Sequence, residues 1–122
     1  ADDNRYLLAR ALQFFVPGIP QVYYVGLLAG RNDMALLQKT QVGRDINRHY
    51  YDHAEITANL ARPVVQQLLE LIRLRNQHPA FNGQFSFAQS STHTMSLHWQ
   101  SEGHWATLEV DFQSSRFSIH SS

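Results

Sequence analysis

The hydrophobic pattern of this chain changes its period near residue 83. Before that point, apolar residues recur in two stretches with a period near 3.6, which is typical of amphipathic helices. After Asn82-Gly83, a turn pair, they alternate with a period of two, which is typical of strands. A helical period does not suit a strand, and a strand period does not suit a helix. We therefore expect a domain boundary here, with residues 1–82 in one part and residues 83–122 in another.

The two helical stretches have clear ends. The first follows the capping candidates Asp2 to Asn4, carries an apolar stripe that includes Leu7 and Phe14, and stops at Pro17-Gly18. The second starts near Ala61 or Arg62 and ends near Gln77, with Pro63 at an early position where its missing N–H does no harm. Both stretches predict helices with one buried face.

Between the helices, the segment Val22 to Val25 is apolar with almost no polar alternation. Such runs are typical of strands that are buried on both faces in a parallel sheet covered by helices. Helix, short turn and apolar strand together indicate an α/β fold. A polar stretch from Leu27 to about Asn59 follows, and loops of this length inside compact domains are often functional.

The tail predicts four short antiparallel strands joined by turns rich in Ser, Thr and Gly. The alternating apolar residues that indicate these strands are Phe85, Phe87, Met95, Leu97, Trp99, Ala106, Leu108, Val110, Phe117 and Ile119. We expect a small antiparallel sheet over residues 83–122.

Composition excludes several classes of protein. Ten basic and ten acidic residues cancel, and no basic cluster appears, which argues against nucleic acid or an anionic membrane as partner. The chain has no Cys for disulfides and no apolar run long enough to span a membrane. We expect a cytoplasmic protein whose partner is a small neutral molecule or another protein. The start Ala1-Asp2-Asp3, with neither Met nor signal pattern, predicts a chain that begins inside a domain.

Three segments carry a resemblance to a known family. Residues 13–26 read Gln-Phe-Phe-Val-Pro-Gly-Ile-Pro-Gln-Val-Tyr-Tyr-Val-Gly, residues 28–34 read Leu-Ala-Gly-Arg-Asn-Asp-Met, and residues 43–51 read Gly-Arg-Asp-Ile-Asn-Arg-His-Tyr-Tyr. They resemble the sucrose phosphorylases of the α-amylase-like group, and the likeness covers about residues 5–80. It implies the C-terminal part of a (β/α)8 barrel, followed by the small β domain. A complete barrel needs about 250 residues, so this chain would be a C-terminal fragment.

The resemblance also implies an activity for the parent protein. Members of this family transfer a glucosyl group from sucrose or a related glucoside to phosphate by a retaining double displacement, in which one carboxylate is the nucleophile and a second carboxyl group is the acid. The carboxylates of the family lie before this chain, so none is assigned to Asp33, Asp45 or Asp52. The expected partners are a sugar and phosphate, no cofactor is implied, and the fragment alone should be inactive.

One substrate-binding residue follows from the resemblance. Arg44 matches the loop arginine that holds the far hydroxyl groups of the glucosyl unit in this family. A guanidinium suits this role because its rigid fork of donors can bind two oxygens at once. Asp45 and Arg48 are expected to orient the Arg44 side chain, with no substrate contact assigned to either. The alternative for all three is a set of bonds confined to their own loop.

The remaining candidates favour structural roles. His49 lacks a catalytic partner at a suitable spacing, and the pairs His49/His53 and His98/His104 are too sparse to indicate a metal site. The residues expected to be structural, most of them in the core, are Tyr23, Tyr24, Tyr50, Tyr51, Trp99 and Trp105.

Two other functions remain open: a non-catalytic α/β interaction module, and a carbohydrate-binding module on the tail with exposed, coplanar Trp99 and Trp105. We also expect the isolated chain to expose apolar edges and to pair with a second copy, as a homo-oligomer, or to be marginally stable.

Overall fold

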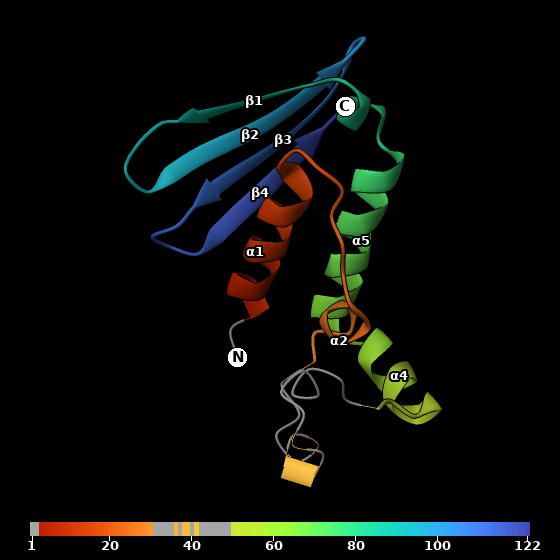
Figure 1. The fold of residues 1–122 in the computed structure, drawn as a ribbon. Coiled ribbons are helices and arrows are strands. Elements are labelled where there is room, and N and C mark those ends of the chain that lie inside the picture. Colours follow the sequence, from red (N-terminus) through yellow and green to blue (C-terminus); the bar gives the residue numbers. More distant parts are fainter. Residues whose placement is uncertain (1–2, 31–35, 37, 40, 42–49) are drawn as a thin grey trace. The chain divides into compact units, whose positions relative to one another are not determined.

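The computed structural model describes residues 3–30, 36, 38, 39, 41 and 50–122, and these fall into two compact units. Unit 1 combines Ala1–Pro20 with Glu70–Ser122, and unit 2 is Gln21–Leu69. In chain order the described elements are α1 (Asp3–Phe15), α2 (Tyr24–Leu27), α4 (His53–Leu60), α5 (Pro63–Gln77), η2 (Pro79–Asn82), β1 (Gln84–Gln89), β2 (Thr94–Ser101), β3 (His104–Asp111) and β4 (Arg116–Ser121) (Figure 1).

Unit 1 contains a four-stranded antiparallel sheet in which the strands follow one another in the order β1-β2-β3-β4. This confirms the small antiparallel sheet predicted from the alternating tail. The register aligns Leu97 of β2 with Leu108 of β3, and Leu108 with Ile119 of β4, so one face collects apolar side chains. The β2–β3 hairpin turns at Glu102 and Gly103, whose φ angles of 46° and 85° suit the twist of a tight hairpin.

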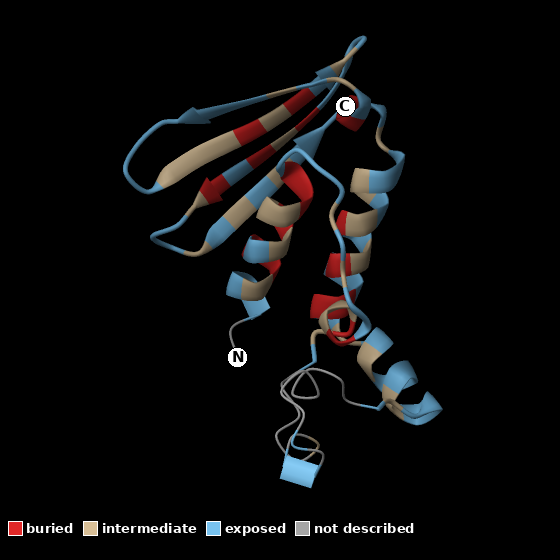
Figure 2. Ribbon diagram, in the orientation of Figure 1, coloured by how far each residue is buried: buried red, intermediate tan, exposed pale blue. Residues whose placement is uncertain are grey.

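The apolar face of the sheet is covered by α1, as Figure 2 shows by the buried residues on both elements. The predicted stripe on α1 is buried, with Phe14 at 3% and Phe15 at 1% exposure. Leu108 of β3 is fully buried. Apolar burial at about 25 cal/mol per Å² makes this interior the main source of stability in unit 1.

An aromatic cluster joins η2 to the sheet and to α1. The ring centroids of Phe15 and Phe81 lie 5.2 Å apart, edge to face, and Phe81 lies 5.7 Å from Trp99. The ring centroid of Phe85 lies 5.2 Å from that of Trp99. Offset and edge-on pairs of this kind add to the stability gained by burial.

Glycine is required where η2 enters the sheet. A Cβ atom built on Gly83 would overlap the carbonyl oxygen of Gln100, which is backbone and cannot swing away. His78 begins η2 by accepting a hydrogen bond at Nδ1 from the backbone N–H of Ala80. The period change near residue 83 therefore coincides with a close backbone crossing.

Unit 2 contains α2, α4 and the first half of α5. The start of α5 at Pro63 and its end at Gln77 confirm the second predicted helix. Helix α4 lies inside the stretch that the sequence predicted as loop. Its signal was Asp52, whose Oδ1 accepts a hydrogen bond from the Glu55 N–H at 2.7 Å, the usual cap of a helix N-terminus.

The strand predicted over Val22–Val25 is wrong for this structure. Residues 21–23 have no regular structure, and Tyr24–Leu27 form the short helix α2. A strand needs a neighbour to pair its backbone groups, and the described part of the chain contains no parallel strand beside this segment. The backbone instead bonds to itself, with Leu27 N–H donating to Tyr23 and Gly30 N–H to Val25. Described residues accordingly show helices and an antiparallel sheet, without a barrel.

Candidate functional site

An apolar hollow of about 420 Å³ lies in unit 2. Its lining residues come from before and after Arg44 in the sequence. It is lined by Tyr24, Leu27, Leu28, Tyr50, Tyr51, Ile56 and Leu60. Tyr24 and Leu27 belong to α2 and Leu28 follows it, Tyr50 and Tyr51 precede the N-cap of α4, and Ile56 and Leu60 belong to α4. Tyrosine rings and aliphatic side chains dominate the lining, which is typical of surfaces that bind the apolar face of a ligand or of another polypeptide.

Tyr51 closes one wall of the hollow. Its ring packs edge to face on Tyr24, with centroids 5.9 Å apart, and Tyr23 stacks against Tyr24 at 4.5 Å. The Tyr51 hydroxyl lies so close to Gly30 that a Cβ atom there would overlap it. Gly30 and Tyr51 therefore lie close together in space although 20 residues separate them in the sequence.

Arg62 forms hydrogen bonds to the backbone at the end of α2. Its Nη1 donates to the carbonyls of Leu28 and Ala29 at 3.2 and 3.3 Å, and to Asn59 Oδ1 at 2.9 Å. The two carbonyls end α2, where backbone acceptors lack helical partners. Ala29 has a φ of 50°, a conformation that is uncommon for a residue with a side chain. One guanidinium thus stabilises a turn that the backbone alone would not favour.

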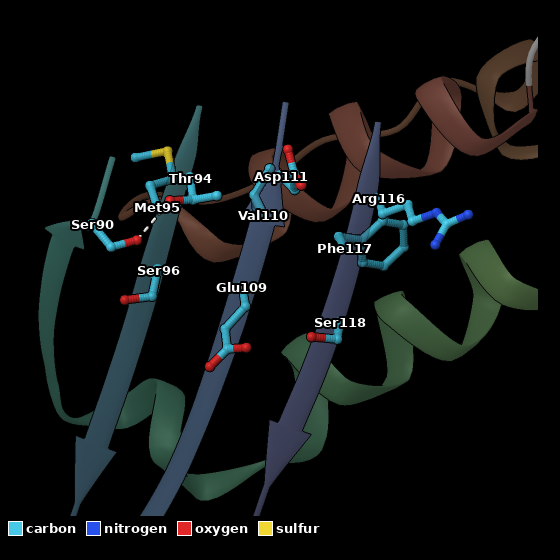
Figure 3. A pocket seen from close by; sticks show the side chains of 10 residues that line it. All are labelled: Ser90, Thr94, Met95, Ser96, Glu109, Val110, Asp111, Arg116, Phe117 and Ser118. Carbon is cyan, nitrogen blue, oxygen red and sulfur yellow. Dashed lines mark hydrogen bonds between the residues drawn. The ribbon is translucent and has the colours of Figure 1, made fainter. Parts of the chain in front are cut away.

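A second, more open hollow of about 680 Å³ lies on the sheet of unit 1 (Figure 3). Its lining residues are Ser90, Thr94, Met95, Ser96, Glu109, Val110, Asp111, Arg116, Phe117 and Ser118. The register places Ser96, Glu109 and Ser118 side by side across three strands. Hydroxyls and carboxylates in such a row can bind water or polyhydroxy groups, but the hollow is shallow and open.

Asp111, at the rim of this second hollow, is held ionised by its own turn. Its Oδ1 accepts hydrogen bonds from the backbone N–H groups of Ser114, at 3.3 Å, and Gln113, at 3.0 Å. The bond from Ser114 lowers the pKa of Asp111 most, and Gln113 and the nearby His93 lower it further. These bonds organise the β3–β4 turn, so Asp111 is a structural carboxylate.

The predicted substrate-binding residue Arg44 and its neighbours Asp45 and Arg48 lie outside the described residues, as does His49. Their roles stay predictions. The described residues adjoining them, Tyr50 and Tyr51, line the apolar hollow, and neither was predicted as part of a site. Because the lining comes from separated segments, a linear pattern could not identify it. The described lining contains no carboxylate, and its polar groups are the hydroxyls of Tyr24, Tyr50 and Tyr51.

Of the aromatic residues expected to be in the core, some are buried and others are exposed. Trp99 is 7% exposed, which confirms its place in the core. Trp105 is 39% exposed and stacks on His98 at 6.5 Å, so its expected core position is wrong. Tyr23 and Tyr24, at 50% and 37%, are also more exposed than a buried strand would allow. The physical reason in each case is the direction of the backbone, since Trp105 points away from the face that carries Ala106 and the tyrosines lie outside any sheet.

Described residues include no group of three or more His, Cys, Asp or Glu side chains arranged to hold a metal ion. Nor is any of the helices in the described ranges long and apolar enough to cross a membrane.

The chain is similar to named phosphorylases over nearly its whole length, although no family model matches it. It is 54% identical over 121 residues to a sucrose phosphorylase of Agrobacterium vitis, which covers 99% of this chain and 25% of the relative. It is 56% identical over 110 residues to a sucrose phosphorylase of Bifidobacterium adolescentis, covering 90% of this chain and 22% of the relative. The chain therefore spans about a quarter of the length of these relatives.

A solved structure shares the fold. The crystal structure of sucrose 6F-phosphate phosphorylase from Thermoanaerobacter thermosaccharolyticum superposes with a TM-score of 0.95 at 48% identity, covering 98% of this chain and 24% of that chain. The resemblance inferred from residues 13–51 is confirmed by these relatives.

Proposed function

Since this chain is homologous to sucrose phosphorylases, we propose that it forms the C-terminal quarter of an enzyme that transfers a glucosyl group from sucrose, or a related glucoside, to phosphate. The observation that carries the proposal is the 54% identity over 99% of the chain. Chains this similar share their fold, and the relatives are named for this activity. The retaining double displacement, with its carboxylates in the part of the polypeptide before this chain, belongs to the same proposal.

Within that enzyme, we propose that residues 1–82 complete a (β/α)8 barrel and that residues 83–122 form the small β domain. The apolar surface of unit 2 supports a contact between this part of the chain and the rest of the enzyme. Tyr50 is 76% exposed, and Ile56 and Leu60 of α4 are 37% and 38% exposed. Exposed apolar patches of this kind mark contacts with another polypeptide. A homo-oligomer and a cytoplasmic location remain predictions.

Arg44 is the substrate-binding residue of this proposal, with Asp45 and Arg48 orienting it. The test is Arg44→Ala in the intact polypeptide that carries residues 1–122. Loss of charged hydrogen bonds worth about 3 kcal/mol should lower kcat/KM for glucosyl transfer by about 100-fold. Arg44→Lys should remain impaired because an ammonium lacks the planar fork.

The matched control is Arg73→Ala, which removes the same side chain from an exposed position on α5. It should leave kcat/KM within about twofold of the unsubstituted enzyme, as is usual for surface substitutions. Equal kcat/KM in the Arg44→Ala and Arg73→Ala enzymes would remove Arg44 from the site. An intact polypeptide with no glucosyl transfer from sucrose or a related glucoside would overturn the proposed function itself.

The carbohydrate-binding alternative finds less support. It requires two exposed, coplanar tryptophans on the tail, whereas Trp99 is buried and bonded to the backbone of α1. Trp105 alone offers one ring, and His98 already stacks on it. No described residue favours the interaction module over the enzyme.

A further inference from the structure

Arg75, in the last turn of α5, is held against two aromatic rings. Its guanidinium carbon lies 4.8 Å from the ring centroid of Phe81 and 5.2 Å from that of Trp99. Its Nη2 donates to the carbonyl of Gly18 at 3.0 Å, a residue 57 positions earlier. Within the described ranges its buried Nε has no hydrogen-bond partner. A charged side chain is thus held in place by stacking and by one long-range bond.

Trp99 makes a second long-range bond to the same stretch of chain. Its indole Nε1 donates to the carbonyl of Phe15 at 2.8 Å, and this bond is buried. Phe15 is the last residue of α1, so its carbonyl has no partner inside the helix. The indole therefore caps α1 from the sheet, and the buried acceptor would be left unsatisfied without it.

These two bonds act on carbonyls only three residues apart. The side chains that supply them stack on each other, so a shift of one moves the other. Between the carbonyls, the chain turns at Pro17-Gly18, where Gly18 has a φ of 125°. No atom lies within 4 Å of a Cβ built on Gly18, so glycine is needed for this backbone conformation and not for space.

We propose that Arg75 and Trp99 are positioning residues for glucosyl transfer, because they hold residues 15–18, where the chain leaves α1 before the stretch of sequence that contains Arg44. The proposal rests on the proposed function, since Arg44 lies in that stretch. Neither side chain is assigned a contact with substrate. Lysine could not replace Arg75, because it has no planar group to stack on Phe81 and Trp99 while bonding Gly18.

The bond network is tested on chain 1–122 itself, which contains two tryptophans and so gives two indole N–H signals in a ¹⁵N spectrum. Arg75→Met keeps an unbranched side chain of similar length but loses the plane and the bond. It should shift the Trp99 indole signal and speed its hydrogen exchange by about tenfold or more. Arg73→Met, on the exposed side of α5, should leave that signal in place. An unmoved Trp99 indole signal in the Arg75→Met chain would contradict the coupling between the Arg75 and Trp99 side chains.

The positioning role is tested in the intact polypeptide. Arg75→Met and Trp99→Phe should each lower kcat/KM by about 10- to 100-fold, mostly in kcat, since small displacements of positioned groups are costly. Arg75→Lys should not restore activity. The control is Leu108→Ala, a core change in the same unit that destabilises while removing neither the bond of Arg75 to Gly18 nor the bond of Trp99 to Phe15. It should keep kcat/KM at 25 °C within about twofold while the protein stays folded.

The outcomes separate the two proposals. Activity lost equally in the Leu108→Ala and Arg75→Met enzymes would reduce Arg75 to a stability role and overturn its positioning role. An intact polypeptide without glucosyl transfer would remove the proposed function, and the positioning role with it. The Trp99 indole signal would still show whether the Arg75 and Trp99 side chains are coupled. Should Arg75→Met fail to fold, Trp99→Phe, which loses only the indole N–H and some ring area, takes its place in the activity measurements, and Arg75→Lys takes its place in the ¹⁵N spectrum, where it should also shift the Trp99 indole signal.

Discussion

The two units of this chain differ in how they bury their apolar side chains. Unit 1 covers one face of its sheet with α1, and Phe15 and Leu108 are almost completely buried. Unit 2 includes α4, which has no buried residue, and Tyr50, which is 76% exposed. Unit 2 also buries apolar side chains, among them Val65 and Leu68 of α5, so the contrast with the covered sheet of unit 1 lies in α4 and Tyr50. Unit 2 presents an apolar surface suited to a further polypeptide, which we propose is the rest of a phosphorylase.

The largest effect that separates the units is expected from matched core deletions. Leu108→Ala removes a fully buried side chain and should lower the free energy of unfolding by about 2–5 kcal/mol. Ile56→Ala in α4 removes a side chain that is 37% exposed and should cost less than about 1 kcal/mol in chain 1–122. Urea unfolding followed by tryptophan fluorescence measures both. A cost for Ile56→Ala as large as for Leu108→Ala would show that α4 is packed as tightly as the sheet of unit 1.

A smaller effect is expected from two glycines that both lack room for a side chain. In Gly83→Ala the new methyl group meets the backbone of Gln100, so we expect a loss of about 1–3 kcal/mol. In Gly30→Ala the first obstacle is the hydroxyl of Tyr51, the far end of a side chain that can move. The cost should therefore be lower, measured as the change in urea midpoint.

The paired variant sharpens this test. Adding Tyr51→Phe to Gly30→Ala removes the overlapping hydroxyl and should recover part of the lost stability, whereas Tyr51→Phe added to Gly83→Ala should recover none. Absence of any coupling between positions 30 and 51 would contradict the close approach of the Tyr51 hydroxyl to Gly30.

The smallest effect is a pH dependence confined to unit 1. Hydrogen bonds from the Ser114 and Gln113 backbone lower the pKa of Asp111 in the folded protein below its unfolded value. Its contribution to stability is therefore present above the unfolded pKa and is lost as the pH falls through the folded pKa. Asp111→Asn should be slightly less stable than the original chain at pH 7, and the difference should vanish in acid. Thermal unfolding from pH 7 to pH 2 checks this, and a difference that persists at pH 2 would contradict it.

Local patterns predicted the elements whose partners are close in the sequence. The stripe on α1, the helix after Pro63 and the alternation after Gly83 gave helices and strands because each carries its own period. Helix α4 was missed although Asp52 and Glu55 mark its first turn. The lining of the apolar hollow was missed for another reason, since α2, Tyr51 and α4 meet only in space.

The sequence by itself determined the antiparallel sheet, the two long helices and the kinship with phosphorylases, because these depend on short-range periodicity and on residue identities. Only the tertiary structure decided that residues 24–27 form a helix, that Trp105 faces outward and that Arg75 and Trp99 hold the end of α1. Each of these depends on backbone pairing or on contacts between residues far apart in the sequence. A strand forms only where another strand satisfies its hydrogen bonds, and a side chain is buried only where another element covers it.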